Sequence, residues 1–314
     1  MKTLIAIDDS DCSRWAVESL ACYNWTEEDE IRVVTVIDLF EFVPSSYYDE
    51  TEAMTKAKKV LEEGVSILKK QFPKAQISSS IIKGLVKPAI VELCDQWKPD
   101  LLAVGSHGRK GFKKLLLGSV SNSLLLSAPC PVLLIKNKSL VTDEKHKTVL
   151  ISVDNSEYSK ETVEAVLNTD FADDIKFHVL SVVENINDVY CLDYACANYI
   201  QQLGELRKEI EREATELVDQ LKDKLGDRFG AERVSGGIIN GHVPEAILEE
   251  AKTRSAGLIV LGSHGKNFVE RMIIGSVSYS IAVQSECSVL VVKSDEVEEK
   301  SVTTVEQKVE AVNK

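Results

Sequence analysis

Short apolar runs alternate along the chain with stretches in which apolar residues recur every three or four positions. The runs are rich in β-branched residues, and their pattern predicts strands that are buried on both faces. In the first half of the chain they lie at 3–7, 31–37, 76–83, 101–104 and 132–135. The stretches between them predict helices with one face toward a core. Strands that are separated by helices in this way predict a parallel sheet covered on both sides.

The second half of the chain repeats the pattern of the first. Asp8 has a counterpart 146 residues later at Asp154, whereas Gly105 has one 157 residues later at Gly262. The second half therefore contains about 11 additional residues after its second strand. A repeat of this length indicates two duplicated domains rather than the short units of a solenoid.

The length and composition agree with two domains of ordinary size. The chain has 314 residues, of which 44% are hydrophobic and 28% are charged, as in globular proteins. We expect two tandem doubly wound α/β domains at 1–138 and 146–294, each with a five-stranded parallel sheet flanked by helices. The polar residues 136–147 link them, and a charged tail occupies 295–314.

Both halves carry the same glycine spacing, G-x-x-G-x9-G-S, which begins at the end of the predicted fourth strand. In an open α/β sheet, ligands bind beyond the carboxyl ends of the strands. Glycines there allow a ligand to approach the backbone closely and can adopt a positive φ. The last Gly-Ser pair opens a helix, whose free N–H groups favour an anion. The members are Gly105, Gly108, Gly118 and Ser119 in the first half, and Gly262, Gly265, Gly275 and Ser276 in the second.

Other polar residues accompany these two glycine motifs. Asp8 and Asp154 end the first strand of each half, where each could accept a hydrogen bond from a base or ribose, or cap the following helix. For the first of these helices Ser10, Asp11 and Ser13 are alternative caps. Five cations in or beside the loops could offset phosphate charge or simply be exposed: Lys110, Lys113, Lys114, Lys266 and Arg271. His107 and His264 occupy matching positions, where we expect them to shape the loop rather than act as catalytic bases.

Several other sites are absent from the sequence. It has no G-x-x-x-x-G-K-[ST] loop, no G-x-G-x-x-G after a first strand, no S-G-G-x-D-S loop and no G-x-S-x-G turn. The seven cysteines are odd in number and widely spaced, which favours neither a disulfide framework nor a zinc site. We find no convincing acid–base pair or metal cluster, so the sequence indicates binding more strongly than catalysis.

The charge of the chain argues against a nucleic-acid partner. Residues 1–140 contain 18 basic and 18 acidic residues, so the entire net charge of −13 lies in the remainder. Binding to nucleic acid requires basic residues that neutralise phosphates. The apolar runs are far shorter than the roughly 20 residues of a membrane span. With no segment typical of a signal peptide, we expect a cytoplasmic protein that binds neither membrane nor nucleic acid.

Each half resembles a domain of the universal stress protein family, and the resemblance covers about 1–136 and 147–293. It rests on the first strand that ends in Asp8-Asp9-Ser10 or Asp154-Asn155-Ser156, on the two glycine motifs, and on the last strands at 132–134 and 289–291. The glycine motif is typical of the ATP-binding members of that family. The resemblance therefore implies a Rossmann-like fold, similar to that of the adenine nucleotide alpha hydrolases, and ATP as ligand, with or without Mg²⁺.

The resemblance also implies a role for individual residues. Asp8 and Val36 would hold the adenine and its neighbourhood, and Gly105 and Gly108 would line the ribose and phosphate loop. Gly118, Ser119 and Val120 would hold the phosphates. The same roles in the second half would belong to Asp154, Val182, Gly262, Gly265, Gly275, Ser276 and Val277. Because family members commonly pair through their last strands, the two halves would form an internal pseudo-dimer, and a homodimer stays open.

Three functions are compatible with these features. The first is an ATP-binding stress-response regulator that holds nucleotide in both domains. The second is a slow ATPase or nucleotide-handling enzyme, and the third is a scaffold or ligand carrier that uses the additional segment at 185–202 and the tail. In that segment Tyr190, Leu192, Tyr194 and Tyr199 could form an adhesive patch. Gly257 in place of Asp100 and Ser288 in place of Pro131 distinguish the second half.

Overall fold

A computed structural model describes residues 1–38, 50–108, 117–137, 144–184, 197–264 and 274–293, with only the backbone described at 144 and 197–203. The elements of the first domain are β1 (Lys2–Ala6), α1 (Asp11–Ser19), η1 (Leu20–Cys22), β2 (Glu30–Ile37), α2 (Glu50–Gln71), β3 (Gln76–Lys83), α3 (Val86–Trp97), β4 (Leu101–Gly105), α4 (Ser119–Ser127) and β5 (Val132–Ile135). The predicted first-domain strands are thus present, within one residue at each end.

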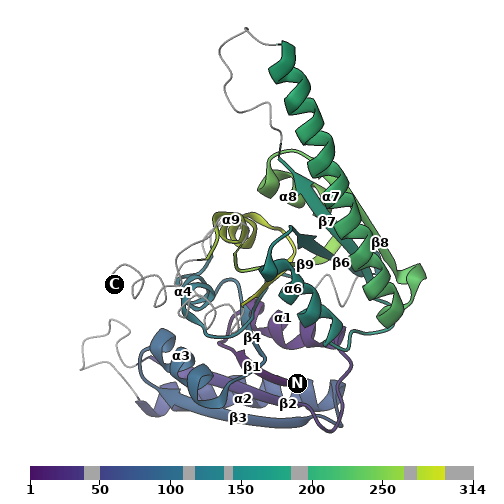
Figure 1. Ribbon diagram of the computed structural model, residues 1–314. Coiled ribbons are helices and arrows are strands. Elements are labelled where there is room, and N and C mark those ends of the chain that lie inside the picture. Colours follow the sequence, from purple (N-terminus) through teal and green to yellow (C-terminus); the bar gives the residue numbers. More distant parts are fainter. Residues whose placement is uncertain (39–49, 109–116, 138–143, 185–196, 265–273, 294–314) are drawn as a thin grey trace, which may run out of the picture.

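The second domain repeats this order after a short helical turn, η2 (Glu144–His146). Its elements are β6 (Thr148–Val153), α6 (Glu157–Leu167), β7 (Lys176–Val183), α7 (Ala197–Phe229), η4 (Ala231–Arg233), β8 (Val234–Asn240), α8 (Val243–Thr253), β9 (Ala256–Gly262), α9 (Ser276–Gln284) and β10 (Ser288–Val292). Helix α7 is longer than its counterpart α2 and extends beyond the body of the second domain (Figure 1). The prediction of tandem doubly wound α/β domains is confirmed.

All the strands named above belong to one sheet of ten, in the order β3-β2-β1-β4-β5-β10-β9-β6-β7-β8. Neighbours within a domain are parallel, but β5 and β10 pair antiparallel, with Leu133 opposite Leu290. The two domains are therefore joined through their last strands, the arrangement that the resemblance implied. Because the strands reverse direction at this seam, the carboxyl ends of β1 and β6 lie at opposite edges of the sheet.

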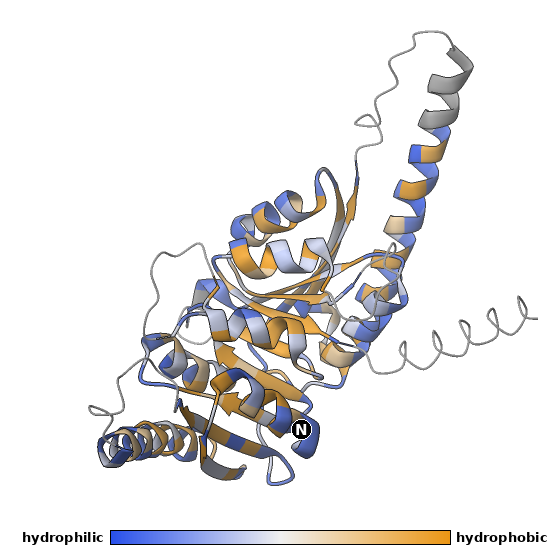
Figure 2. Cartoon of the chain, turned by 90° about the vertical axis from the view of Figure 1, so that its left-hand side faces the viewer, coloured by the Kyte–Doolittle hydropathy of each residue, from blue (hydrophilic) through white to orange (hydrophobic). Residues whose placement is uncertain are grey.

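Helices cover the sheet on both faces, and two cores result. The first core contains residues of α1, α2, α6 and α7, such as Val17 and Val163, and the second contains residues of α3, α4, α8 and α9, such as Leu124 and Ile281. Figure 2 shows hydrophobic strands between helices that are hydrophobic on one side only. This is the distribution expected for amphipathic helices over a sheet that is buried on both faces.

Two lysines fasten the domains together beside the seam. Lys136, just after β5, donates from Nζ to the carbonyl oxygens of Val283 and Ser285 at 2.9 and 2.6 Å. Its counterpart Lys293 donates to Ala128 O at 2.5 Å. Each lysine thus satisfies carbonyls at the carboxyl end of the other domain's α9 or α4. Burial lowers the pKa of both lysines to about 8.

The two departures of the second half are accommodated at the ends of strands. Asp100 accepts a hydrogen bond from Lys2 N at 2.6 Å, whereas Gly257 lies where the pairing of β6 with β9 shifts register. The Ser288 hydroxyl accepts a hydrogen bond from Lys136 N at 3.4 Å. Ser288 therefore contributes to the seam between the domains. No helix of the described residues is long and apolar enough to cross a membrane.

Candidate functional site

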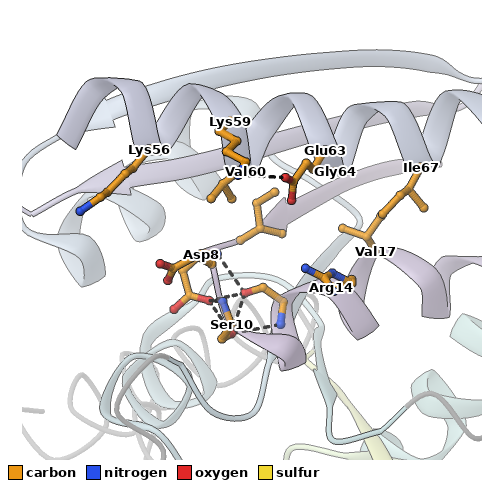
Figure 3. A pocket seen from close by; sticks show the side chains of 13 residues that line it. Asp8, Ser10, Arg14, Val17, Lys56, Lys59, Val60, Glu63, Gly64 and Ile67 are labelled. Carbon is orange, nitrogen blue, oxygen red and sulfur yellow. Dashed lines mark hydrogen bonds and ion pairs between the residues drawn. The ribbon is translucent and has the colours of Figure 1, made fainter. Parts of the chain in front are cut away.

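Asp8 lies just beyond β1 and is held by the first turn of α1. Its Oδ1 accepts hydrogen bonds from Ser10 N at 3.0 Å and from the hydroxyls of Ser10 and Ser13 at 2.5 and 2.6 Å (Figure 3). The Ser13 hydroxyl also accepts from Asp8 N at 2.9 Å. The cap of α1 is Ser10, which accepts from Ser13 N at 3.2 Å. Capping is therefore the role of Ser10 among the three alternatives, and Asp8 is instead an oriented acceptor.

The second domain reproduces this arrangement at the opposite edge of the sheet. Asp154 Oδ1 accepts from Ser156 N at 3.2 Å, from the Ser156 hydroxyl, and from the Ser159 hydroxyl at 2.7 Å. Ser156 caps α6. Both domains thus hold one carboxylate oxygen on three donors, which fixes the direction of the other.

The glycines at the end of β4 and β9 serve close packing. A Cβ on Gly105 would lie 2.8 Å from the backbone carbon of Cys12, and one on Gly262 would lie 3.2 Å from Tyr158 O. Because they lack a Cβ, the two glycines let the carboxyl ends of β4 and β9 pack closely against the first turn of α1 and of α6. The positive-φ glycines of the described chain are Gly84 and Gly230, so the positive φ allowed for Gly105 and Gly108 is not used.

Gly108 brings the loop after β4 against the carboxylate. A Cβ on Gly108 would lie 2.8 Å from Asp8 Oδ2, so a larger residue would displace the acceptor. Gly118 lies on the other side of the same short loop, and its N–H donates to Ser106 O at 2.8 Å. Asp8 and the amino end of α4 are consequently gathered around Ser106 to Gly108.

The amino end of each final helix is open toward solvent. Gly118 is the N-cap of α4 and provides no side-chain cap, and the following Ser119 is exposed. Gly275 and Ser276 repeat this at α9. The first N–H groups of such a helix attract an anion through unpaired donors and the helix dipole. Ser119 does not cap the helix, so its hydroxyl is available to a ligand.

Two further serines, which the sequence analysis did not single out, hold these helices in place. The Ser121 hydroxyl donates to Gly105 O at 2.7 Å, and Ser278 donates to Gly262 O at the same distance. Ser10 and Ser13 were likewise recognised only as helix caps. The repeated pattern D-x-S-x-x-S, at Asp8 and again at Asp154, could have revealed the carboxylate arrangement.

The valines assigned to the nucleotide lie on one side of the sheet. Val36 and Val120, like Val182 and Val277, are partly buried against the core formed with α3, α4, α8 and α9. They provide apolar surface beside the carboxyl ends of β2 and β7 and within the first turn of α4 and α9. Asp8, just beyond β1, borders both this face of the sheet and the opposite face, which α1 covers.

The two loop histidines are tied to neighbouring serines. His107 Nδ1 lies 3.0 Å from Ser106 Oγ, and His264 Nδ1 lies 2.9 Å from Ser263 Oγ. Beside them the domains differ, because Cys12 occupies the position of Tyr158, whose ring lies 5.1 Å from that of His264. Burial raises the pKa of the Cys12 thiol. These contacts are those expected of loop-shaping histidines.

Some predicted site residues lie outside the described part of the chain. They are Lys110, Lys113, Lys114, Gly265, Lys266 and Arg271 in the two loops, and Tyr190, Leu192 and Tyr194 of the additional segment with the charged tail. Tyr199 lies in the part of α7 of which only the backbone is described. Within the described residues, no group of three or more His, Cys, Asp and Glu side chains could hold a metal ion.

Comparison with known proteins gives consistent similarities. The sequence model of the universal stress protein family matches this chain twice, over residues 1–136 and 145–293. A universal stress protein of Mycobacterium tuberculosis (strain ATCC 25618 / H37Rv) is 28% identical over 228 residues, 70% of this chain and 70% of the relative. Another from that strain is 24% identical over 311 residues, 92% of this chain and 94% of the relative. A universal stress protein from Archaeoglobus fulgidus, 24% identical in sequence, has a crystal structure with a TM-score of 0.62 that covers 93% of this chain and 98% of that one, so the fold is shared.

Proposed function

This chain belongs to the universal stress protein family, and on that premise we propose that it is a stress-response regulator that binds an adenine nucleotide, ATP above all, in both domains. The observation that carries the proposal is the pairing, in each domain, of an oriented carboxylate with the open amino end of a helix. In the first domain the two meet at Ser106 to Gly108, where Gly108 faces Asp8 Oδ2 and Gly118 donates to Ser106.

The chemistry of the two groups suits the two ends of a nucleotide. An ionised carboxylate accepts hydrogen bonds and favours ribose hydroxyls or a base amino group. The free N–H groups of Gly118, Ser119 and Val120 favour phosphate oxygens, as do those of Gly275, Ser276 and Val277. Val36 and Val182 provide apolar surface for the base at the ends of β2 and β7. We propose no protein side chain as a ligand of Mg²⁺.

A calorimetric titration of the full chain tests this proposal. We expect ATP to bind at two sites per chain, adenosine to bind more weakly because it lacks phosphates, and inorganic triphosphate to bind more weakly because it lacks the base and ribose. Replacement Asp8→Ala should weaken one of the two ATP sites at least tenfold, since it removes a charged acceptor worth about 1.5–3 kcal/mol. Measurement of phosphate release in the same samples separates binding from turnover.

The neighbouring carboxylate provides the matched control. Asp9 is exposed, and its counterpart in the second domain is Asn155. Asp9→Asn should therefore leave both ATP sites unchanged. Equal loss in Asp8→Ala and Asp9→Asn would show that negative charge at this edge matters but an oriented acceptor does not. Absence of ATP binding by the wild-type chain up to millimolar concentration would refute the proposal itself.

A further inference from the structure

A pocket of about 320 Å³ opens between α1 and α2 of the first domain (Figure 3). It begins at Asp8 and continues along the groove between the two helices, on the face of the sheet opposite α3 and α4. The valines assigned to the nucleotide lie on that other face. The pocket is therefore a second space, which borders the nucleotide edge at Asp8 and at the two serines that orient it, Ser10 and Ser13. Its volume lies at the lower end of the range for small-molecule sites, about 300–1,000 Å³.

The inner surface of the pocket is apolar, and its rim carries the cations Arg14, Lys56 and Lys59 beside the carboxylates Asp9 and Glu63. Ile7 and Val17 form part of the floor and are 7% and 1% exposed, and Ile67 from α2 adds a partly buried side chain. Arg14 on α1 and Lys59 on α2 reach the same pocket from opposite sides. Such a lining suits a ligand with an apolar body and a negatively charged end.

Two of the three carboxylates that line the pocket, Asp8 and Glu63, are engaged in other contacts. Asp8 presents Oδ1 to Ser10 and Ser13, and its Oδ2 faces Gly108 on the nucleotide side. Glu63 lies 3.9 Å from Lys59 in an ion pair on the surface of α2. The third carboxylate, Asp9, lies on the exposed turn before α1. Within the described residues Arg14 takes part in no ion pair, so an anion in the groove would meet a guanidinium that these carboxylates do not neutralise.

The same groove of the second domain is filled and bridged. Leu221, 8% exposed, occupies the position of Gly64 on the sheet-facing side of the helix. Lys224, in the position of Ile67, pairs with Glu164 across the groove at 2.6 Å. Along the rim, Glu216 replaces Lys59. The first domain thus has an open groove with Arg14 at its rim, whereas a larger side chain and an ion pair occupy the same position in the second domain.

Gly64 lowers the stability of α2, and this cost supports a specific role for the glycine. A glycine within a helix costs roughly 1 kcal/mol relative to alanine. A Cβ at Gly64 would lie 2.9 Å from Ile7 Cδ1, so the glycine leaves the floor of the groove to Ile7. The second domain has the smaller Val153 in place of Ile7 and the larger Leu221 in place of Gly64.

We propose that the groove between α1 and α2 of the first domain binds a small organic anion with an apolar body, whose charged end is held by Arg14. The site is separate from the nucleotide edge and has no equivalent in the second domain. It does not depend on nucleotide binding, so either proposal can fail alone.

Calorimetric titration with octanoate and with octylammonium tests the proposal on the full chain. Octanoate should bind at one site per chain and at least fivefold more tightly than octylammonium, because only the anion can be paired with Arg14. Arg14→Gln should weaken octanoate about tenfold, as expected for loss of a charge-assisted hydrogen bond. The matched control is Lys160→Gln at the equivalent position of the second domain, and it should change nothing.

A second variant closes the groove with side chains that this fold already accommodates. Ile7→Val combined with Gly64→Leu reproduces Val153 and Leu221, and it should abolish octanoate binding while ATP binding and thermal unfolding stay near wild type. Equal binding of octanoate and octylammonium, or equal loss in Arg14→Gln and Lys160→Gln, would overturn the proposal. So would undiminished octanoate binding in the folded double variant. If that variant does not fold, the comparison of Arg14→Gln with Lys160→Gln decides.

Discussion

In the first domain Asp8 accepts hydrogen bonds from Ser10 and Ser13, and in the second Asp154 accepts the same set from Ser156 and Ser159. Away from these carboxyl edges the domains differ. At the opposite end of the strands, Arg32 lies 5.9 Å from the Trp97 ring in the first domain, and the equivalent of Arg32 in the second is the buried His178.

This difference separates two kinds of constraint within one fold. The residues that differ lie in the groove beside α1 and at the amino ends of the strands. There the side chains of either domain keep the core filled. The elements that agree surround a carboxylate and a helix end, which are polar groups that packing alone does not require. The agreement of the two domains supports the proposed nucleotide sites, and their difference supports the proposed anion site of the first domain.

The largest effect should come from the buried histidine of the second domain. His178 Nδ1 lies 2.9 Å from Ser235 Oγ, and its Nε2 lies 3.5 Å from Glu250. Burial, with help from Arg254, lowers the pKa of His178 to about 4 from 6.5, against the pull of Glu250. The neutral imidazole therefore stabilises the fold above pH 6.5, and that contribution, about 3 kcal/mol, is lost as the pH falls to 4.

Urea unfolding between pH 7 and pH 4 checks this prediction. The His178→Gln variant should lose less stability over that range than the wild type, because its side chain does not titrate. The difference should appear in the unfolding of the second domain, since Arg32 in the first carries a permanent charge. Parallel pH profiles of variant and wild type would contradict the assignment.

The next effect compares the glycines that end β4 and β9. Gly105→Ala should cost about 2 kcal/mol, because its Cβ would meet the Cys12 backbone at 2.8 Å. Gly262→Ala should cost about 1 kcal/mol or less, since its closest contact is Thr162 Oγ1 at 3.1 Å. Thermal unfolding of the two variants measures the difference, and equal destabilisation would show that close packing against α1 is not the reason for Gly105.

A smaller effect should arise at the seam between the domains. The pKa of Lys136 is lowered to about 8 by burial, so the unfolded chain holds more protons between pH 8 and 10.5. Stability should therefore rise with pH in that window, by roughly 2 kcal/mol for this lysine. Denaturant unfolding at pH 7.5 and pH 10 should show the rise in the wild type and a reduced rise in Lys136→Met. An unchanged rise would mean that Lys136 is as readily charged in the fold as in solution.

The smallest effect on stability should belong to the exposed serines of the two final helices. Ser119→Ala and Ser276→Ala should each change the free energy of unfolding by less than about 0.5 kcal/mol, because neither side chain caps its helix. Each should nevertheless weaken ATP at its own site several-fold. A clear loss of stability with unchanged ATP binding would assign these hydroxyls a structural role.

Much of the fold could be predicted from the sequence because it depends on periodicity. The strands at 31–37 and 132–135 and the helix after Gly118 follow from apolar patterns and a helix-opening glycine. The site could be predicted only in outline. The spacing of Gly105, Gly108 and Gly118 indicated an anion-binding edge, but the reason for Gly105 is its contact with Cys12, which is distant in sequence.

Other features depend on contacts that no local pattern records. The groove beside Gly64 depends on the packing of this glycine against Ile7, which is distant in the sequence. A single glycine in a helical stretch does not predict that contact. The reach of Lys136 to the carboxyl end of α9 depends on the antiparallel seam, which only the resemblance suggested. Serines such as Ser121 are too common for their type alone to reveal that they fix a helix to a strand.

The central claim is that each domain binds a nucleotide at the carboxyl ends of its strands. Native mass spectrometry of the full chain titrated with ATP tests this claim most directly. At an ATP concentration that just fills both sites of the wild type, we predict two bound ATP molecules in the wild type and mostly one in Asp8→Ala and in Asp154→Ala, because each replacement weakens one site at least tenfold. Because the two sites lie at opposite edges of the sheet, the two ATP molecules should bind independently of each other. A wild-type chain that binds one ATP or none under these conditions, or variants that still bind two, would contradict it.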